Sequence, residues 1–208
     1  MVPGTTVARY PSIMDTIQGA PGKSRASRIG RHIINLANTN MTISRRAERC
    51  LLRFYTEEAV EALIAYCASP NPVARYRAAH VLGKSRDSRA FAALLALMND
   101  EDERVRYDAI IALGDLGDPR AAEAVAVWLE PDPQSLEAGA ASIALGFLGE
   151  AAIPVAQRLL SGPIRGNRRT AVYILASIGG KGLKIVRGLL TSPDPDLRAA
   201  AADAIGES

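Results

Sequence analysis

Small apolar residues recur along this chain in columns spaced 30 to 32 residues apart. An alanine stands at the same place in each of six repeats, and a leucine or isoleucine follows four positions later. The position after that serves as the anchor of the repeat. The anchors are Leu52, Gly83, Gly114, Gly146, Ala176 and Gly206. Positions one, two and five before an anchor fall on one stripe of an α-helix, so the pattern predicts amphipathic helices repeated as in a solenoid.

Each repeat also holds a second apolar stripe, which predicts a pair of helices, named here helix A and helix B. Helix A is expected over residues 73–84 in one repeat and 105–116 in the next. Turns such as GDLGDPR follow, where glycine ends one helix and aspartate caps the next. In helix B of one repeat the stripe consists of Phe91, Leu94, Leu95 and Met98. We therefore expect an all-α fold, an α-α superhelix of antiparallel helix pairs.

The pattern also predicts how the chain is divided. Residues 1–24 are expected to form a partly ordered arm, and residues 25–208 the solenoid. Within the solenoid, residues 25–40 match a degenerate N-terminal cap, with residues 11–18 as its other helix. The repeats are expected to start near positions 41, 70, 101, 131, 162 and 192.

One repeat follows the pattern D-x-x-V-R-x-x-A-x-x-A-L-G-x-x-G-D-x-R-A between Asp102 and Ala121. This pattern resembles the short HEAT-like repeat named for the phycobilisome (bilin) lyases. The resemblance extends over about residues 41–208 and implies a fold rather than one activity, since scaffolds, lyases and other enzymes share it. Leu52 and Ala176 depart from the anchor glycine, and Ala138 departs from an arginine column.

The arginine column suggests two roles. Its members are Arg75, Arg106, Arg168 and Arg198. They could form a basic ladder that binds a ligand, but each stands in the first turn of helix A, near acids between the repeats such as Asp102 and Asp194. We expect these arginines to tie neighbouring repeats together.

Helix B was expected to line the concave side of the stack and to bind a partner there. The expected partner-binding residues are Glu58, Glu61, Arg89, Ala93, Glu123, Val127, Gln157, Arg158, Lys184 and Arg187. Their charge changes from acidic to basic along the chain, which suits a protein or peptide whose own charge runs the opposite way. Trp128 is expected in the core, or else at the edge of this groove.

Charge is distributed unevenly although the net charge is only +3. It is +6 over residues 1–49, −7 over 50–150, +7 over 151–191 and −3 over 192–208. The basic block comprises Arg165, Arg168, Arg169, Lys181, Lys184 and Arg187. It is expected to be a solvated surface, or else to attract an acidic partner, nucleic acid or the propionate groups of a tetrapyrrole. The acidic middle argues against nucleic acid, because a surface that tracks a duplex should be basic throughout.

Apolar runs fall short of the roughly 20 residues that span a bilayer. The N-terminus also lacks an apolar signal-peptide core. We therefore expect a cytoplasmic protein that does not enter a membrane.

Candidate catalytic groups are scarce. His32 and His80 lie in different repeats without an adjacent acid, so the His-Glu pairs of metal-dependent HEAT-like hydroxylases are missing. Cys50 and Cys67 occupy apolar positions of the repeat and are expected in the core. We expect no catalytic residue, no metal and no cofactor, and hence a non-catalytic interaction module or scaffold.

The alternative is a bilin lyase-like subunit or a chromophore-handling chaperone. What the resemblance to that family implies is a protein that holds a bilin and presents it to a cysteine of an acceptor protein. Arg168, Arg169 and Tyr173 are the candidates for contacting its propionates.

The final helix of the chain, a helix A, was expected either to cap the preceding pair or to expose an apolar face. In the second case we expect weak self- or hetero-association through the C-terminal end.

Overall fold

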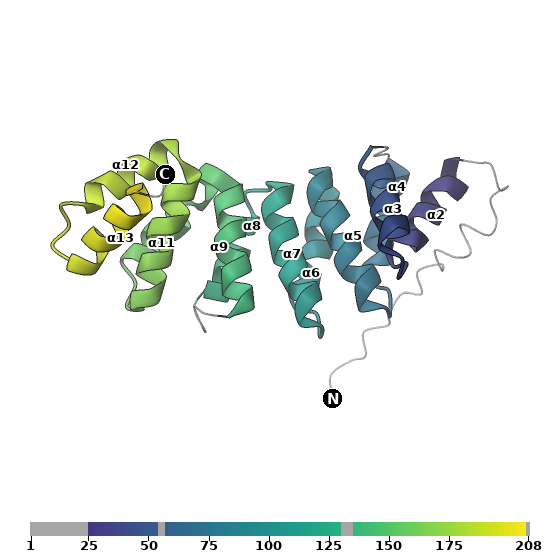
Figure 1. The fold of residues 1–208 in the computed structure, drawn as a ribbon, viewed down its shortest axis with the longest axis horizontal. Coiled ribbons are helices and arrows are strands. Elements are labelled where there is room, and N and C mark those ends of the chain that lie inside the picture. The colour runs from purple at the N-terminus through teal and green to yellow at the C-terminus, as the bar shows by residue number, and fades with distance from the viewer. Residues whose placement is uncertain (1–24, 54–56, 130–134, 207–208) are drawn as a thin grey trace, which may run out of the picture.

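The computed structural model describes residues 25–53, 57–129 and 135–206 (Figure 1). The expected arm over residues 1–24 and the helix expected over 11–18 lie outside this part of the chain. Within it the fold is all-helical, without strands, as the repeat predicted. Odd-numbered helices stand side by side along the long axis of an elongated molecule.

The odd-numbered row corresponds to the predicted helix A and begins after an N-terminal helix, α2 (Arg25–Leu36). It comprises α3 (Met41–Arg53), α5 (Pro72–Ser85), α7 (Glu103–Leu116), α9 (Leu136–Leu148), α11 (Arg165–Ile178) and α13 (Pro195–Gly206). The even-numbered row corresponds to helix B. It comprises α4 (Glu57–Tyr66), α6 (Phe91–Leu97), α8 (Ala121–Ala126), α10 (Ile153–Leu160) and α12 (Gly180–Leu189). Short 3-10 turns adjoin three of the even helices, at Ser88–Ala90, Val127–Leu129 and Gly149–Ala152.

Side-chain caps start several helices of the odd-numbered row. The carboxylate of Asp102 accepts hydrogen bonds from the N–H groups of Arg104 at 3.0 Å and Val105 at 3.2 Å. Asn71 and Ser135 cap α5 and α9 in the same way. These caps satisfy backbone donors that have no partner within the helix, so each helix begins where the sequence places a short polar side chain.

The buried stripe of the odd-numbered row is the column pattern seen in the sequence. Ala78, Ala109 and Ala141, five positions before their anchors, are fully buried. Leu82 and Leu113, one position before theirs, are fully buried as well. Each repeat therefore packs the same apolar stripe against its neighbours, and one continuous core runs along the stack.

The anchor glycines let neighbouring odd-numbered helices touch through their backbones. A Cβ on Gly83 would lie 2.6 Å from the Cα of Ala112, and a Cβ on Gly114 would lie 2.6 Å from the Cα of Ala144. Even-numbered helices are set farther apart; α4 and α6 have a hollow between them, floored by small residues such as Ala65 and Ala93.

The step from α9 to α11 differs from the steps before it. A Cβ on Gly146 would meet the Ser177 hydroxyl at 2.8 Å, not the residue two positions before the next anchor. That residue is Ile174, which is bulkier than the alanines at the preceding steps. Ala138 also replaces the column arginine on α9. This junction therefore lacks both features that hold α5, α7 and α9 together.

One stretch, Leu136–Leu160, has the length and hydropathy of a membrane-spanning helix, which the sequence reading did not expect. In the structure it is divided into α9 and α10 by the 3-10 turn at Gly149–Ala152. About 44% of its most apolar window is buried inside the stack. Its hydropathy is thus that of core helices, and it is weak evidence for a membrane span.

Candidate functional site

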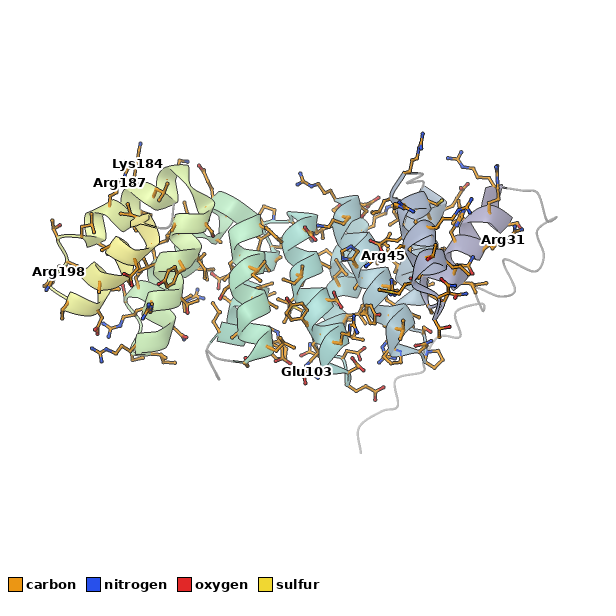
Figure 2. All side chains as sticks on the ribbon, in the orientation of Figure 1. Arg31, Arg45, Glu103, Lys184, Arg187 and Arg198 are labelled. Atoms are coloured by element: carbon orange, nitrogen blue, oxygen red, sulfur yellow. The ribbon has the colours of Figure 1, made fainter. Side chains whose placement is uncertain are left out.

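The ten predicted partner-binding residues lie on the even-numbered row. They occupy α4 (Glu58, Glu61), α6 and its preceding turn (Arg89, Ala93), α8 and its following turn (Glu123, Val127), α10 (Gln157, Arg158) and α12 (Lys184, Arg187). Ala93 is half-buried and the other nine are exposed. Lys184 and Arg187 project from α12 at one end of the molecule (Figure 2).

Several of these charges pair with one another. Arg158 on α10 lies 2.8 Å from Glu123 on α8, and Arg89 lies 3.7 Å from Glu61 on α4. Val127 is 58% exposed and is the one large apolar side chain among the ten. Trp128 beside it is half-buried and packs against the core, as expected. The even-helix face, defined as the surface of these ten residues, is thus mainly charged and joined by exposed ion pairs.

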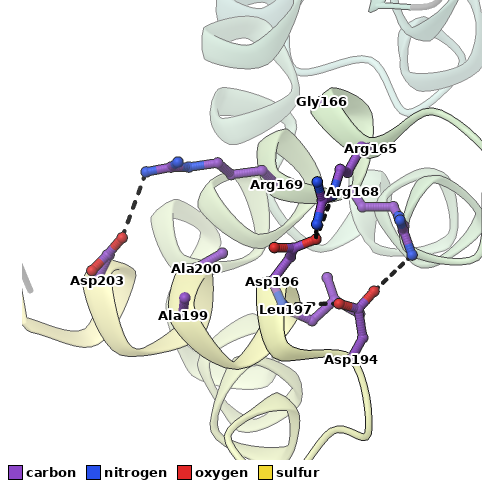
Figure 3. Close-up of a pocket in the computed structure, with 10 residues that line it drawn as sticks. All are labelled: Arg165, Gly166, Arg168, Arg169, Asp194, Asp196, Leu197, Ala199, Ala200 and Asp203. Atoms are coloured by element: carbon purple, nitrogen blue, oxygen red, sulfur yellow. Dashed lines mark hydrogen bonds and ion pairs between the residues drawn. The ribbon is translucent and has the colours of Figure 1, made fainter.

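Most of the basic block predicted over residues 165–187 is neutralised by acids. Figure 3 shows Arg165 paired with Asp196, Arg168 with Asp194 at 2.7 Å and Arg169 with Asp203 at 3.5 Å, all between α11 and α13. Lys181 lies 2.7 Å from Glu150 in the same way. Asp194, just before α13, and Asp196 and Asp203 on α13 belong to the segment after the basic block, so the sum of charges along the sequence did not reveal these pairs.

The residues named as candidates for bilin propionates are engaged among themselves and with acids. Arg169 donates a hydrogen bond of 3.2 Å to the Tyr173 hydroxyl. The Arg168 guanidinium is held by Asp194. A propionate would therefore have to displace an existing anionic partner.

Three members of the arginine column have the structural role that the sequence predicted, whereas the fourth, Arg198, donates to the carbonyl oxygens of Ser192 and Pro193 within its own repeat. Arg75 donates two hydrogen bonds of 2.7 Å to Asp100, and both side chains are only 9% exposed. Arg106 reaches Glu137 on the next odd-numbered helix at 2.7 Å. Burial opposes the ionised form of Asp100, but hydrogen bonds from Arg75 and from the Asp102 N–H outweigh it and lower the pKa of that carboxyl. These pairs tie consecutive repeats together.

The histidine prediction needs one correction, because the structure brings an acid beside His80. Its Nε2 lies 3.1 Å from the Glu48 carboxylate of the preceding repeat. Asp108 also lies close to His80, and burial raises the pKa of its carboxyl. Within the described residues, no three His, Cys, Asp or Glu side chains form a group that could hold a metal ion. The contact is thus a single pair between helices that adjacency in sequence does not reveal.

Cys67 is buried, as the sequence predicted, whereas Cys50 is half-buried. Burial raises the pKa of the Cys67 thiol to about 12. The thiol therefore stays protonated at neutral pH and behaves as a small apolar side chain.

The sequence reading missed the outer surface of the odd-numbered row. On α9 the positions ten, seven and three before the anchor, and one after it, are exposed on the outer side of this row. Along α9 these positions hold Leu136, Gly139, Ile143 and Phe147. Leu136, Ile143 and Phe147 are 50%, 45% and 56% exposed, although they are large and apolar. Because they are spaced by seven and four residues, they form one line on the helix.

Aromatic and aliphatic side chains extend this line onto the neighbouring helices. Tyr107 and Ile111 on α7, and Tyr173 on α11, occupy the same outward columns and are half-buried. Tyr76 on α5 lies under the Arg104 guanidinium, 4.4 Å from its ring centre. We call this surface the odd-helix face; its apolar part consists of Tyr76, Tyr107, Ile111, Leu136, Ile143, Phe147 and Tyr173.

The columns that form this face vary from repeat to repeat. The column three positions before the anchor reads Arg49, His80, Ile111, Ile143, Tyr173 and Asp203. Because a scaffold keeps its packing columns alike and varies its contact columns, this variability was the available signal for a binding face.

Comparison with known proteins gives the fold an independent basis. A family model for HEAT repeats matches residues 33–101 and again residues 60–146. No curated protein matches the chain in sequence.

Several solved structures are similar to this chain, among them the following three. One is a complex of CpcE and CpcF of phycocyanin lyase from Nostoc sp. PCC7120; it is 23% identical, covers 97% of this chain and 81% of its own, and has a TM-score of 0.54. An archaeal HEAT-like repeats protein from Thermococcus onnurineus NA1 is 15% identical, with 86% and 79% covered and a TM-score of 0.55. The condensin Cnd3-Cnd2 subcomplex of S. pombe is 17% identical, with 93% and 32% covered and a TM-score of 0.53.

At these identities the similar structures establish the fold alone. The family matches together span residues 33–146, more than half of the sequence. The chain belongs to the HEAT repeat family.

Proposed function

We propose that this protein is a non-catalytic interaction module that binds a protein partner, acting in the cytoplasm. The observation that carries the proposal is the line of exposed Leu136, Ile143 and Phe147 on α9, with tyrosines on either side. Exposed apolar patches of this kind mark protein-binding sites, and aromatic side chains dominate the binding energy of interfaces. The odd-helix face is therefore the first candidate surface.

The even-helix face, predicted from the sequence, is the second candidate. Val127 and the hollow between α4 and α6 favour it, since they offer apolar contact beside charges of both signs. Its exposed ion pairs contribute little by themselves. The two faces lie on different helix rows, so substitutions on one leave the other intact.

Paired substitutions test the proposal and choose between the faces. A partner is captured from the source organism, purified, and titrated against the wild-type chain, Ile143→Asp/Phe147→Asp and Val127→Asp. We expect the α9 double variant to weaken binding by at least about 30-fold, the effect of losing about 2 kcal/mol at a hot spot. Val127→Asp, a matched change at an equally exposed apolar site, should bind within about twofold of wild type.

Other results would redirect or end the proposal. A large loss with Val127→Asp alone would place the site on the even-helix face. If only nucleic acid copurifies and salt elutes it steeply, the chain is not a protein-binding module.

A bilin lyase-like role is the alternative that the family resemblance implies. It is favoured less, because Arg168 and Arg169 already have acidic partners. Mixing the chain with phycocyanobilin should leave the absorption band of the pigment unchanged. A shifted and intensified band would favour the alternative.

A further inference from the structure

The charges around the odd-helix face are arranged unequally at its two ends. On α3, Arg45 and Arg49 occupy the outward columns and are exposed. Neither has a hydrogen-bond or ion-pair partner among the residues that the structure describes. Figure 2 places Arg45 on the α3 side of the molecule. This end of the face therefore presents uncompensated positive charge.

The other end of the face is electrically balanced. There the arginines of α11 pair with the aspartates of α13, as Arg165 does with Asp196 and Arg169 with Asp203 (Figure 3). Exposed Arg–Asp pairs leave little net field for a partner to meet. The face thus runs from a basic end on α3, over the apolar line on α9, to a neutral end.

We infer that the odd-helix face binds an amphipathic helix of a partner protein, with the acidic end of that helix over α3. The inference rests on the proposed function and adds the chemistry and the direction of the partner. Apolar residues at helical spacing on the partner would cover Ile143 and Phe147. Carboxylates at one end would pair with Arg45 and Arg49, which fixes the orientation.

The length of the partner helix follows from the spacing of the row. Three interhelical steps separate α3 from α9, and packed helices lie about 8–10 Å apart. The span is therefore about 24–30 Å, which a helix of roughly 16–20 residues covers at 1.5 Å per residue. A single amphipathic helix of ordinary length can reach both the apolar line and the arginines.

Selection from a displayed library of helical 20-residue peptides tests this inference on the intact chain. We expect the enriched peptides to carry an apolar stripe at i, i+3, i+4 and i+7 and acids clustered at one end. Selection against Arg45→Glu/Arg49→Glu should instead enrich peptides with bases at that end. Individual peptides should lose at least about tenfold in affinity with this variant and with Ile143→Ala/Phe147→Ala, and less than twofold with Val127→Ala.

The outcomes separate the two levels of the proposal. The orientation would be overturned if the enriched peptides need Ile143 and Phe147 but carry scattered acids. It would also be overturned if they bind Arg45→Glu/Arg49→Glu as well as wild type. In both cases the binding function would still stand. A library that yields no peptide sensitive to the α9 residues would overturn the odd-helix face as a binding site. Unfolding temperatures within a few degrees of wild type confirm that each variant is folded.

Discussion

Glycine occurs in two columns of the repeat, at the anchor and three positions after it, and its structural role differs between them. Gly83 and Gly114, the anchor glycines, lie inside helices, where the missing side chain permits backbone contact with the next repeat. Termination belongs to the column three positions later. There Gly117 adopts a left-handed φ of 73°, in the αL C-cap conformation that favours glycine. In the repeat one glycine thus allows close helix packing and another ends the helix.

Replacing the packing glycine should destabilise the fold. In Gly83→Ala the new methyl group meets the Ala112 backbone, and we expect a net loss of about 1–3 kcal/mol in the free energy of unfolding. Gly139→Ala is the control, since nothing lies within 4 Å of its added Cβ. That change should stabilise the protein by up to about 1 kcal/mol through helix propensity. Urea denaturation measures both; equal effects would refute the packing role.

On α5 the stopping column holds an arginine where α7, α9 and α11 have glycine. Arg86 caps α5 with φ 54°, a left-handed conformation that costs a residue with a Cβ about 1 kcal/mol. We expect Arg86→Gly to raise the free energy of unfolding by about 0.5–1 kcal/mol. An unchanged or lower value in thermal or urea unfolding would contradict this account of the cap.

Neighbouring repeats are joined by the arginine column as well as by the apolar stripe. Arg75 with Asp100, and Arg106 with Glu137, link consecutive repeats through buried or half-buried pairs. Helix α9 has no arginine in this column to make such a link to the next repeat, because Ala138 occupies the position. The stack therefore consists of a tightly joined part, α5 to α9, followed by a junction that depends on apolar contact.

The link between Arg75 and Asp100 should show in the pH dependence of stability. The folded-state pKa of Asp100 is lowered, so its contribution is complete above its unfolded pKa of about 3.9 and is lost as pH falls through the folded value. At pH 7 we expect Arg75→Ala to cost about 3 kcal/mol, because it leaves a buried carboxylate unpaired. Below about pH 4 the difference from wild type should shrink.

The control for this prediction is Arg158→Ala. It removes another pair between repeats, with Glu123, but there both side chains are more than half exposed. Its cost should stay below about 1 kcal/mol. Two results would show that burial does not determine how much the Arg75–Asp100 pair stabilises the fold. One is an equal loss in the free energy of unfolding for Arg158→Ala and Arg75→Ala. The other is a loss for Arg75→Ala that stays constant down to pH 3.

The described residues present two long faces of different character, and the last described helix, α13, has an exposed alanine on a packing column. On α13, Ala202 occupies the column of Ala79, four positions before the anchor. Ala79 is fully buried under the next repeat, whereas Ala202 is exposed. The side of α13 that carries Ala202 is therefore exposed, whereas the following repeat buries the same side of the earlier helix α5.

This end should support the weak association that the sequence predicted. Light scattering of the 208-residue chain should show a mass that rises at high concentration, because close packing of small residues becomes available between copies. Ala202→Glu should keep the chain monomeric. A wild-type mass that stays constant at every concentration would contradict the prediction.

Periodic columns were enough to predict the helices, their order and their buried stripe. Alanine and leucine at fixed spacing can be buried together only on one side of a helix, and the caps at Asn71 and Asp102 follow from local chemistry alone. The structural role of Arg75 was also visible, because its acidic partners lie in the loop before the next helix. All of these are properties of single helices or of adjacent segments.

Contacts between repeats depended on how the helices stack. Adjacency in sequence did not show that Glu48 meets His80 or that Asp196 neutralises Arg165, since each pair spans about one repeat. Nor did it show that the odd-numbered helices form the closer row. Helical periodicity tells which residues share a side of a helix, but the glycine contacts between backbones determine how closely the odd-numbered helices pack.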